Sequence, residues 1–180
     1  MTQNDKYDMI LSRASVRRFK AALTAEETEA LLRAAMSAPT AMDFQPWHFV
    51  VVNDNATKEQ MRTFLPYAKM INENCTGIVV CGDIDLYKAV SERDGEDNTL
   101  YWVEDCSAAS ENLLLAAHAL GLGAVWTGIY PLESRISKLR ATLALPQNIV
   151  PLNLILAGHP LVPGRAKDKF DATKIHYEKF

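Results

Sequence analysis

The stretch from Thr99 to Ile129 constrains the fold of this chain more than any other segment. Between Leu113 and Leu120 only His118 is polar, so apolar and small residues occupy every side of the helical wheel. A helix of this kind is buried and needs neighbours all around it. One domain of this size does not readily supply them, so the pattern already points to a second subunit.

Both ends of this helix carry boundary signals. The residues at its start that offer N-cap oxygens are Asp97, Asn98 and Thr99. Gly121 and Gly123 can adopt the left-handed conformation that ends a helix. The apolar run at 124–129 then predicts a short buried strand.

Composition limits the class of protein. Hydrophobic residues make up 48% and charged residues 23% of the 180 residues, as in soluble globular proteins, and the length predicts one domain over 1–180. The net charge of −3 gives no reason to expect nucleic acid or an anionic membrane as partner. No apolar run approaches the length of a transmembrane helix. The 3 cysteines are odd in number and form no C-x-x-C pattern, which favours reduced thiols and a cytoplasmic location.

A basic run covers residues 13–20 of this otherwise acidic chain. If the run is extended, Arg13, Ser15 and Arg17 project to one side, because side chains alternate along a strand. Two guanidinium groups with a hydroxyl between them suit a phosphate. The alternative is a solvated basic face, which the run taken alone slightly favours.

The second predicted helix leads into an unusual loop. Thr24 and Glu27 form a capping box, and the helix that they open should end before Pro39. Residues 38–47 then predict an ordered loop rich in apolar and amide groups. Loops of this composition often line a ligand site, although this one can also simply pack under a helix.

The remaining patterns predict further strands at 47–52, 78–81 and 152–158, and helices at 57–64, 67–73 and 131–143. Thr57 and Gln60 form the box expected to open the first of these helices. The charged residues 83–98 predict an exposed, mobile excursion. The tail at 164–180 is basic and has no core pattern of its own, yet it has enough apolar area to dock on something.

The sequence contains no recognisable dinucleotide-binding or metal-binding motif. Gly121-Leu122-Gly123 is not a dinucleotide fingerprint, because it follows a helix and precedes a strand. The 4 histidines have no ligand spacing with one another or with a cysteine, so no metal site is predicted. Residue patterns alone thus give a soluble α/β-type domain with a candidate anion site.

The sequence also resembles the nitroreductase family of flavin-dependent reductases along nearly its whole length. The segments that carry the resemblance are RASVRRF at 13–19, APTAMDFQPW at 38–47, GLGAVWTG at 121–128, and KDKFD at 167–171 with the HYEKF end at 176–180. Each is a weak signal alone, but their order within a chain this short makes the resemblance specific.

The resemblance implies an α+β fold with a mixed, mainly antiparallel central sheet flanked by helices. It further implies an intertwined homodimer in which the long central helix packs at the interface and the C-terminal tail extends onto the partner. Such a dimer would explain both the helix without a polar face and the tail without a local core.

The resemblance also implies FMN-binding residues in three groups. The group expected to bind the phosphate and ribityl chain comprises Arg13, Ser15, Arg17, Lys167 and Lys169. The group from the loop after the second helix, contributed by the partner chain, comprises Thr40, Asp43 and Gln45. The group expected at the isoalloxazine ring comprises Trp126, Thr127, Gly128 and, through a looser alignment, Lys69.

By the same resemblance, NADH or NADPH reduces the flavin at N5, and a small-molecule acceptor such as a nitroaromatic or quinone reoxidises it. Since no nicotinamide domain is recognisable, the two substrates should take turns, which implies ping-pong kinetics. The cofactor carries the chemistry, so no side chain is predicted to be catalytic. Alternatives are a reductive dehalogenase or ene-type reductase of the same fold, and a flavin-binding protein without turnover.

Two departures from the family pattern bear on specificity. Asp43 stands where asparagine is common, and a carboxylate near the flavin would disfavour its anionic reduced form. Lys169 stands where arginine is common, which removes a forked contact. These differences leave the acceptor and the preferred nicotinamide open.

Overall fold

The computed structural model describes residues 5–180 of the chain. Its helices are α1 (Asp5–Ser12), α2 (Ala25–Met36), η1 (Ala41–Asp43), α3 (Asn55–Phe64), α4 (Asp85–Asp94), α5 (Tyr101–Ala119), α6 (Glu133–Leu143) and η2 (Ala172–Lys174). Its strands are β1 (Phe19–Ala21), β2 (Trp47–Val52), β3 (Thr76–Asp83), β4 (Gly123–Gly128) and β5 (Ile149–Pro160).

The strands form one sheet around β5. β5 pairs with β3 on one side and with β4 on the other, β2 extends the sheet beyond β3, and β1 pairs with the end of β5. All of these pairings are antiparallel. Within residues 5–180, the parallel component is an isolated bridge between Ser15 and Ala124. The expectation of a mainly antiparallel sheet flanked by helices is therefore confirmed.

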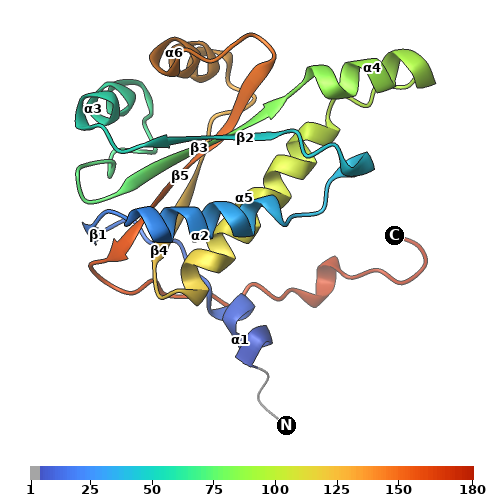
Figure 1. Ribbon diagram of the computed structural model, residues 1–180. Coiled ribbons are helices and arrows are strands. Elements are labelled where there is room, and N and C mark those ends of the chain that lie inside the picture. The colour runs from blue at the N-terminus through green and yellow to red at the C-terminus, as the bar shows by residue number, and fades with distance from the viewer. Residues whose placement is uncertain (1–4) are drawn as a thin grey trace.

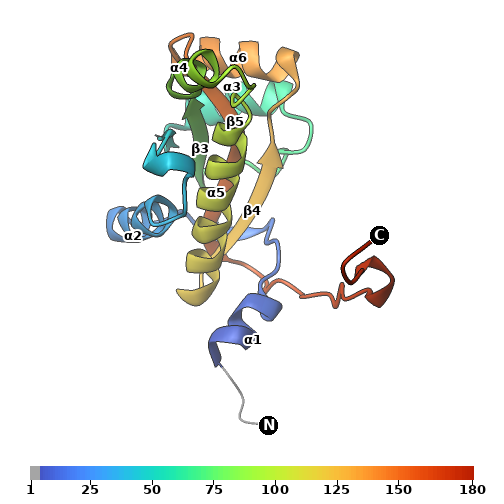
Figure 2. The same cartoon turned by 90° about the vertical axis from the view of Figure 1, so that its right-hand side faces the viewer.

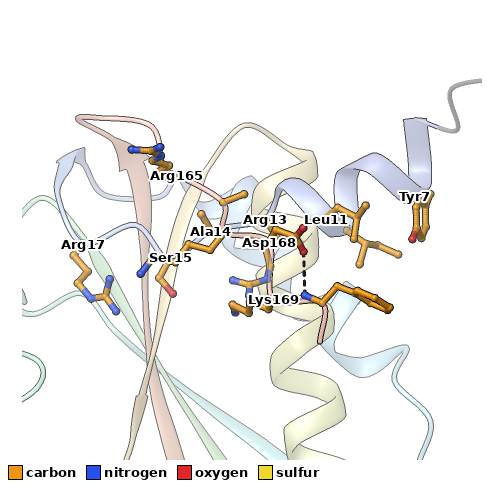
Figure 3. Close-up of a pocket in the computed structure, with 13 residues that line it drawn as sticks. Tyr7, Leu11, Arg13, Ala14, Ser15, Arg17, Arg165, Asp168 and Lys169 are labelled. Carbon is orange, nitrogen blue, oxygen red and sulfur yellow. Dashed lines mark hydrogen bonds between the residues drawn. The ribbon is translucent and has the colours of Figure 1, made fainter. Parts of the chain in front are cut away.

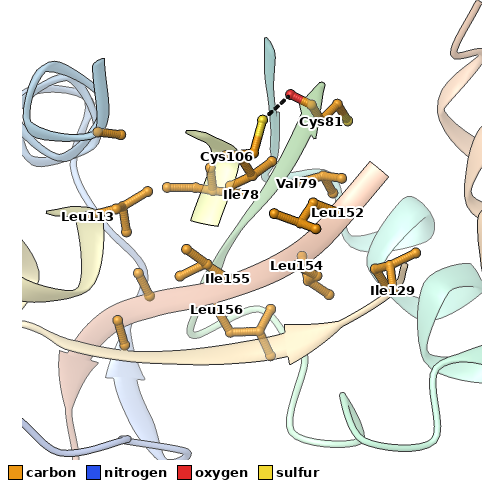
Figure 4. Close-up of a cluster of buried hydrophobic side chains, with 14 of the residues drawn as sticks. Ile78, Val79, Cys81, Cys106, Leu113, Ile129, Leu152, Leu154, Ile155 and Leu156 are labelled. Atoms are coloured by element: carbon orange, nitrogen blue, oxygen red, sulfur yellow. Dashed lines mark hydrogen bonds between the residues drawn. The ribbon is translucent and has the colours of Figure 1, made fainter. Parts of the chain in front are cut away.

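Helices cover both faces of the sheet. α5 and α2 lie against one face, whereas α3 and α6 pack together on the other (Figures 1 and 2). The core between the sheet and α5 contains side chains from both, including Ile78, Ile155 and Leu113 (Figure 4). β3 and β5 are buried along most of their length because each has a helix on either side.

α5 is the central helix that the sequence predicts, but two details differ. Its N-cap is Leu100, without a side-chain cap, and Asp97 accepts instead from the backbone and hydroxyl of Thr99 just before the helix. One face of α5 is open in the single chain, where Glu104 and Glu111 are exposed. At the other end, Gly121 has φ 72°, the left-handed stop expected there.

Three predictions between β2 and α5 are wrong in part. α3 is capped by Asp54, whose carboxylate accepts from Thr57 N at 2.7 Å, so Thr57 and Gln60 do not form the cap. Residues 67–73 form successive turns rather than a helix. The charged segment 83–98 is mostly exposed, as predicted, but it is largely the helix α4, which buries Tyr87 and Val90, rather than an unstructured excursion.

The C-terminal tail leaves the sheet after β5. Its side chains are exposed from Leu161 to Phe180, including Phe170 and Tyr177, and both views show it running away from the body of the fold (Figures 1 and 2). Docking on a partner remains a prediction. Within residues 5–180, no helix is long and apolar enough to cross a membrane.

Candidate functional site

A cavity of about 900 Å³ lies between α1, the extended chain that follows it and the start of the tail. Its charged and hydroxyl side chains are Tyr7, Arg13, Ser15, Arg17, Arg165, Lys167, Asp168 and Lys169. Figure 3 shows Arg17 and Arg165 at one end, Arg13 and Lys169 in the middle, and Leu11 and Tyr7 at the other end. The cavity is therefore cationic with an apolar end, and Asp168 is the single carboxylate that the described residues contribute to it.

Local backbone structure explains how these side chains converge. Val16 N donates to Ala124 O at 2.9 Å, which holds the chain after α1 in an extended form beside β4. In an extended chain alternate side chains share one side, so Arg13, Ser15 and Arg17 all line the cavity, as predicted.

A close approach between backbones brings the tail to this segment. A Cβ added at Gly164 would lie 2.8 Å from the Ala14 Cβ, a distance that is too short for any residue with a side chain. The glycine thus lets the tail lie directly against the basic run. The predicted Lys167 and Lys169 consequently line the same cavity as Arg13 and Arg17.

Sequence reasoning missed Arg165 as a member of the site. The available signal was its spacing, because Arg165, Lys167 and Lys169 alternate in the same way as Arg13, Ser15 and Arg17. Two basic segments thus contribute to the walls of one cavity. Their combined charge suits a ligand bearing a phosphate dianion.

α5 orients the N-terminal part of this site. Arg13 Nε lies 3.2 Å from Glu111 Oε1, and the Ser12 hydroxyl lies 2.8 Å from His118 Nε2. Glu111 and His118 are seven residues apart and so occupy the same face of the helix. That face holds the junction of α1 and the basic run.

The predicted group at 40–45 lies on a different face of α5. Thr40 Oγ1 donates to Asp105 Oδ2 at 2.9 Å and accepts from Gln45 N at 3.0 Å. Gln45 Nε2 donates to Asp43 Oδ1 at 2.9 Å, and both of these side chains are exposed. None of the three predicted residues lines the cationic cavity of the same chain.

The third predicted group lies at the end of β4. Trp126 is half-buried and Thr127 buried, while a Cβ added at Gly128 would meet nothing within 4 Å, so this position faces open space. Ala124, which forms the bridge to Ser15, lies four residues before Gly128, a distance of about 13 Å along a strand. β4 thus connects the cationic cavity at one end to an open turn at the other.

Arg135 on α6 was not predicted and lies at this turn. It donates from Nη1 to Gly128 O at 3.0 Å, and its guanidinium carbon lies 5.3 Å from the centre of the Tyr67 ring. The segment carrying Lys69 therefore adjoins the end of β4. Lys69 itself donates to Arg62 O at 3.0 Å and does not line the cavity.

Thiol and metal chemistry find no support in the residues described. All three cysteines are buried, and burial raises the pKa of Cys81 to about 12, so this thiol is not a nucleophile at neutral pH. Within 5–180, no cluster of three or more His, Cys, Asp or Glu side chains is placed to hold a metal ion.

Comparison with known proteins places this geometry in a family. The profile of the Nitroreductase family matches residues 10–74 and 65–159. A protein of Methanothermobacter thermautotrophicus with the provisional name NADH dehydrogenase/NAD(P)H nitroreductase is 39% identical over 181 residues, covering 100% of this chain and 90% of its own. The FMN reductase (NADPH) of Bacillus subtilis is 26% identical over 185 residues, covering 97% of this chain and 74% of its own.

A solved structure agrees with the sequence comparisons. The crystal structure of a protein from Parabacteroides distasonis, with the same provisional name as the archaeal relative, is 39% identical to this chain. It matches with a TM-score of 0.89 over 99% of this chain and 100% of that one. Sequence and fold therefore agree that the chain belongs to the nitroreductase family.

Proposed function

We propose that this protein is an FMN-dependent oxidoreductase that takes electrons from NADH or NADPH and reduces nitroaromatics, quinones or similar small acceptors. Membership of the nitroreductase family makes it an NAD(P)H/flavin oxidoreductase. The observation that carries the FMN assignment is the cavity in which Arg13, Ser15 and Arg17 meet the basic start of the tail.

The residues of the cavity fit the phosphate end of FMN. A volume of about 900 Å³ is near the upper end of the range for cofactor pockets. Arg17 and Lys167 would neutralise a phosphate dianion, and the Ser15 hydroxyl would donate a hydrogen bond to it. Since Asp168 is the one carboxylate among the described residues that line the cavity, the balance of charge favours an anion.

The ring end of the cofactor would lie toward the open turn at Gly128. Trp126 and Thr127 precede this turn, and Arg135 fixes its carbonyl oxygen. The position of Lys69 on the adjoining segment supports a cation near this end. Bound FMN would supply a two-electron carrier, which accepts hydride from the nicotinamide and passes electrons to the acceptor. No side chain is required as a nucleophile or base.

We propose further that the working form is a homodimer. Thr40, Asp43 and Gln45 belong to the predicted site, yet within one chain they lie on the face of α5 away from the cavity. A second copy would bring its 40–45 turn to this cavity and would cover the open face of α5. It would also cover exposed apolar side chains of α1 and the tail, among them Ile10 and Phe170.

In this arrangement NAD(P)H and the acceptor occupy the same open face in turn, which gives ping-pong kinetics. The experiment is to load the protein with FMN, add NADH or NADPH without oxygen, and follow the flavin absorbance before adding an acceptor. We expect rapid bleaching and then recovery with a nitroaromatic or quinone. Protein that takes up no FMN would overturn the proposal, and flavin that neither nucleotide bleaches would favour a binding protein without turnover.

A further inference from the structure

The turn at residues 40–45 has an unfavourable backbone. Met42, Asp43 and Gln45 have φ of 55°, 55° and 50°, although none of them is glycine. Residues with a Cβ rarely adopt this left-handed region, so the surrounding structure must impose it. All three side chains are exposed, and hence their own packing does not hold the turn.

A buried carboxylate fixes the start of this turn. Asp105 of α5 accepts from Thr40 Oγ1 at 2.9 Å and from Ala41 N at 3.0 Å. It is 5% exposed and, within residues 5–180, forms no ion pair, so hydrogen bonds alone compensate its burial. The Thr40 hydroxyl also accepts a hydrogen bond from Gln45 N, so Asp105 restrains the far end of the turn through Thr40.

Tyr87 completes the carboxylate's hydrogen bonds from a third element. Its hydroxyl donates to Asp105 in a short hydrogen bond, and its side chain is 0% exposed. Burial, and then the bond to Asp105, raise the pKa of Tyr87, so the hydroxyl stays protonated as a donor. The ring also lies 5.2 Å from that of Phe44, inside the turn. The Tyr87 hydroxyl also lies 3.3 Å from Ala41 O, so α4 contacts the turn through this hydroxyl as well as through the aromatic pair.

We infer that Asp105 and Tyr87 are positioning residues that hold the strained turn in the conformation that presents Asp43 and Gln45 to the flavin ring. The inference rests on the proposed function for the identity of the ligand. Its structural part, that this pair of residues imposes the turn, does not depend on any ligand. Asp105 is the central group because it connects the turn, α4 and α5.

Tyr87→Phe is the sharpest test, because it removes one hydroxyl and keeps the aromatic ring. Tyr101→Phe is the matched control, since Tyr101 packs on Tyr87 at 5.9 Å but its hydroxyl forms no hydrogen bond among the described residues. Affinities for FMN and riboflavin are measured for both variants. We expect Tyr87→Phe to lower the affinity for both flavins by about tenfold, which is the effect of losing one hydrogen bond to a charged group. Tyr101→Phe should leave both affinities unchanged.

Hydrogen exchange of the flavin-free protein provides the second measurement. Faster exchange at the amides of Asp43, Phe44 and Gln45 in Tyr87→Phe and Asp105→Asn supports the inference. Unchanged exchange there and wild-type flavin affinity would overturn it, even if the melting temperature fell. If the wild-type protein bound no flavin, the proposed function would fail. The positioning role would then be judged by hydrogen exchange alone, and unchanged exchange of the turn amides in the variants would overturn it.

Discussion

Arg13 Nε lies 3.2 Å from Glu111 Oε1, whereas Arg17 lines the same cavity and has no ion pair among residues 5–180. The two arginines therefore differ in what they offer an anion. Glu111 compensates part of the Arg13 charge and fixes its direction, while the charge of Arg17 remains available to a ligand.

The first prediction follows from this difference. Arg17→Ala should weaken FMN binding by about tenfold or more, as expected for the loss of a charge-assisted hydrogen bond, without dissociating the proposed dimer. Arg13→Ala should weaken FMN binding less than Arg17→Ala does. It should lower the melting temperature more, because it also breaks the contact between the basic run and α5. Flavin titrations and thermal melts of both variants check this order. Equal FMN affinity in wild-type protein and Arg17→Ala would remove Arg17 from the phosphate site.

The second prediction concerns the contact that docks the tail. Gly164→Val places a side chain where the Ala14 Cβ already lies 2.8 Å from an ideal Cβ. The tail must then move away from the basic run, taking Lys167 and Lys169 with it, and FMN affinity should fall by about tenfold. Ala172→Val, in the exposed tail but outside the cavity, is the control and should bind FMN normally. Unimpaired binding in Gly164→Val would mean that the tail does not contact the cofactor.

The third prediction tests the tail's wider role. Removing residues 165–180 should impair both dimerisation and FMN binding, because the tail carries three of the cavity's cations and several exposed apolar side chains. Sedimentation analysis and a flavin titration measure the two effects separately. A truncated protein that is still dimeric and fully loaded with FMN would contradict the proposed arrangement.

The fourth prediction concerns the cap of α3. Hydrogen bonds from the backbone N–H of Thr57 and then from its hydroxyl lower the pKa of Asp54. A carboxyl whose pKa is lower in the folded state stabilises the fold above its unfolded pKa of about 3.9 and loses that effect as the pH falls.

Asp54→Ala should consequently lower the melting temperature at pH 7, and the difference from wild type should shrink as the solution is acidified below about pH 4. Gln60→Ala is the control on the same helix and should melt like wild type at both pH values. A larger effect of Gln60→Ala would restore the Thr57–Gln60 box as the cap.

Much of the fold could be predicted because its signals are local. The capping box at Thr24, the helix predicted from the apolar residues 113–120 and the left-handed stop at Gly121 depend on residues close in sequence, and the structure contains all three. The alternation of Arg13, Ser15 and Arg17 likewise needs only an extended backbone, which the bridge at Ala124 provides.

The missed features depend on contacts between distant segments. α4 is stabilised as part of the fold by burying Tyr87, whose partner Asp105 lies on another helix, and the charged sequence around it carries no sign of that contact. Asp105 is itself a signal in the sequence, since a carboxylate inside an apolar helix must find partners. Arg135 is closer in sequence, seven residues after Gly128, and its contact depends on the turn between β4 and α6.

The central claim is that the cationic cavity binds the FMN phosphate, and a comparison of FMN with riboflavin tests it most directly. The two flavins share their ring system and differ by the phosphate group. We predict that the wild-type protein binds FMN at least about tenfold more tightly than riboflavin at low salt, and that added salt reduces this ratio by screening the cations. Equal affinities for the two flavins at low salt would contradict the assignment of this cavity.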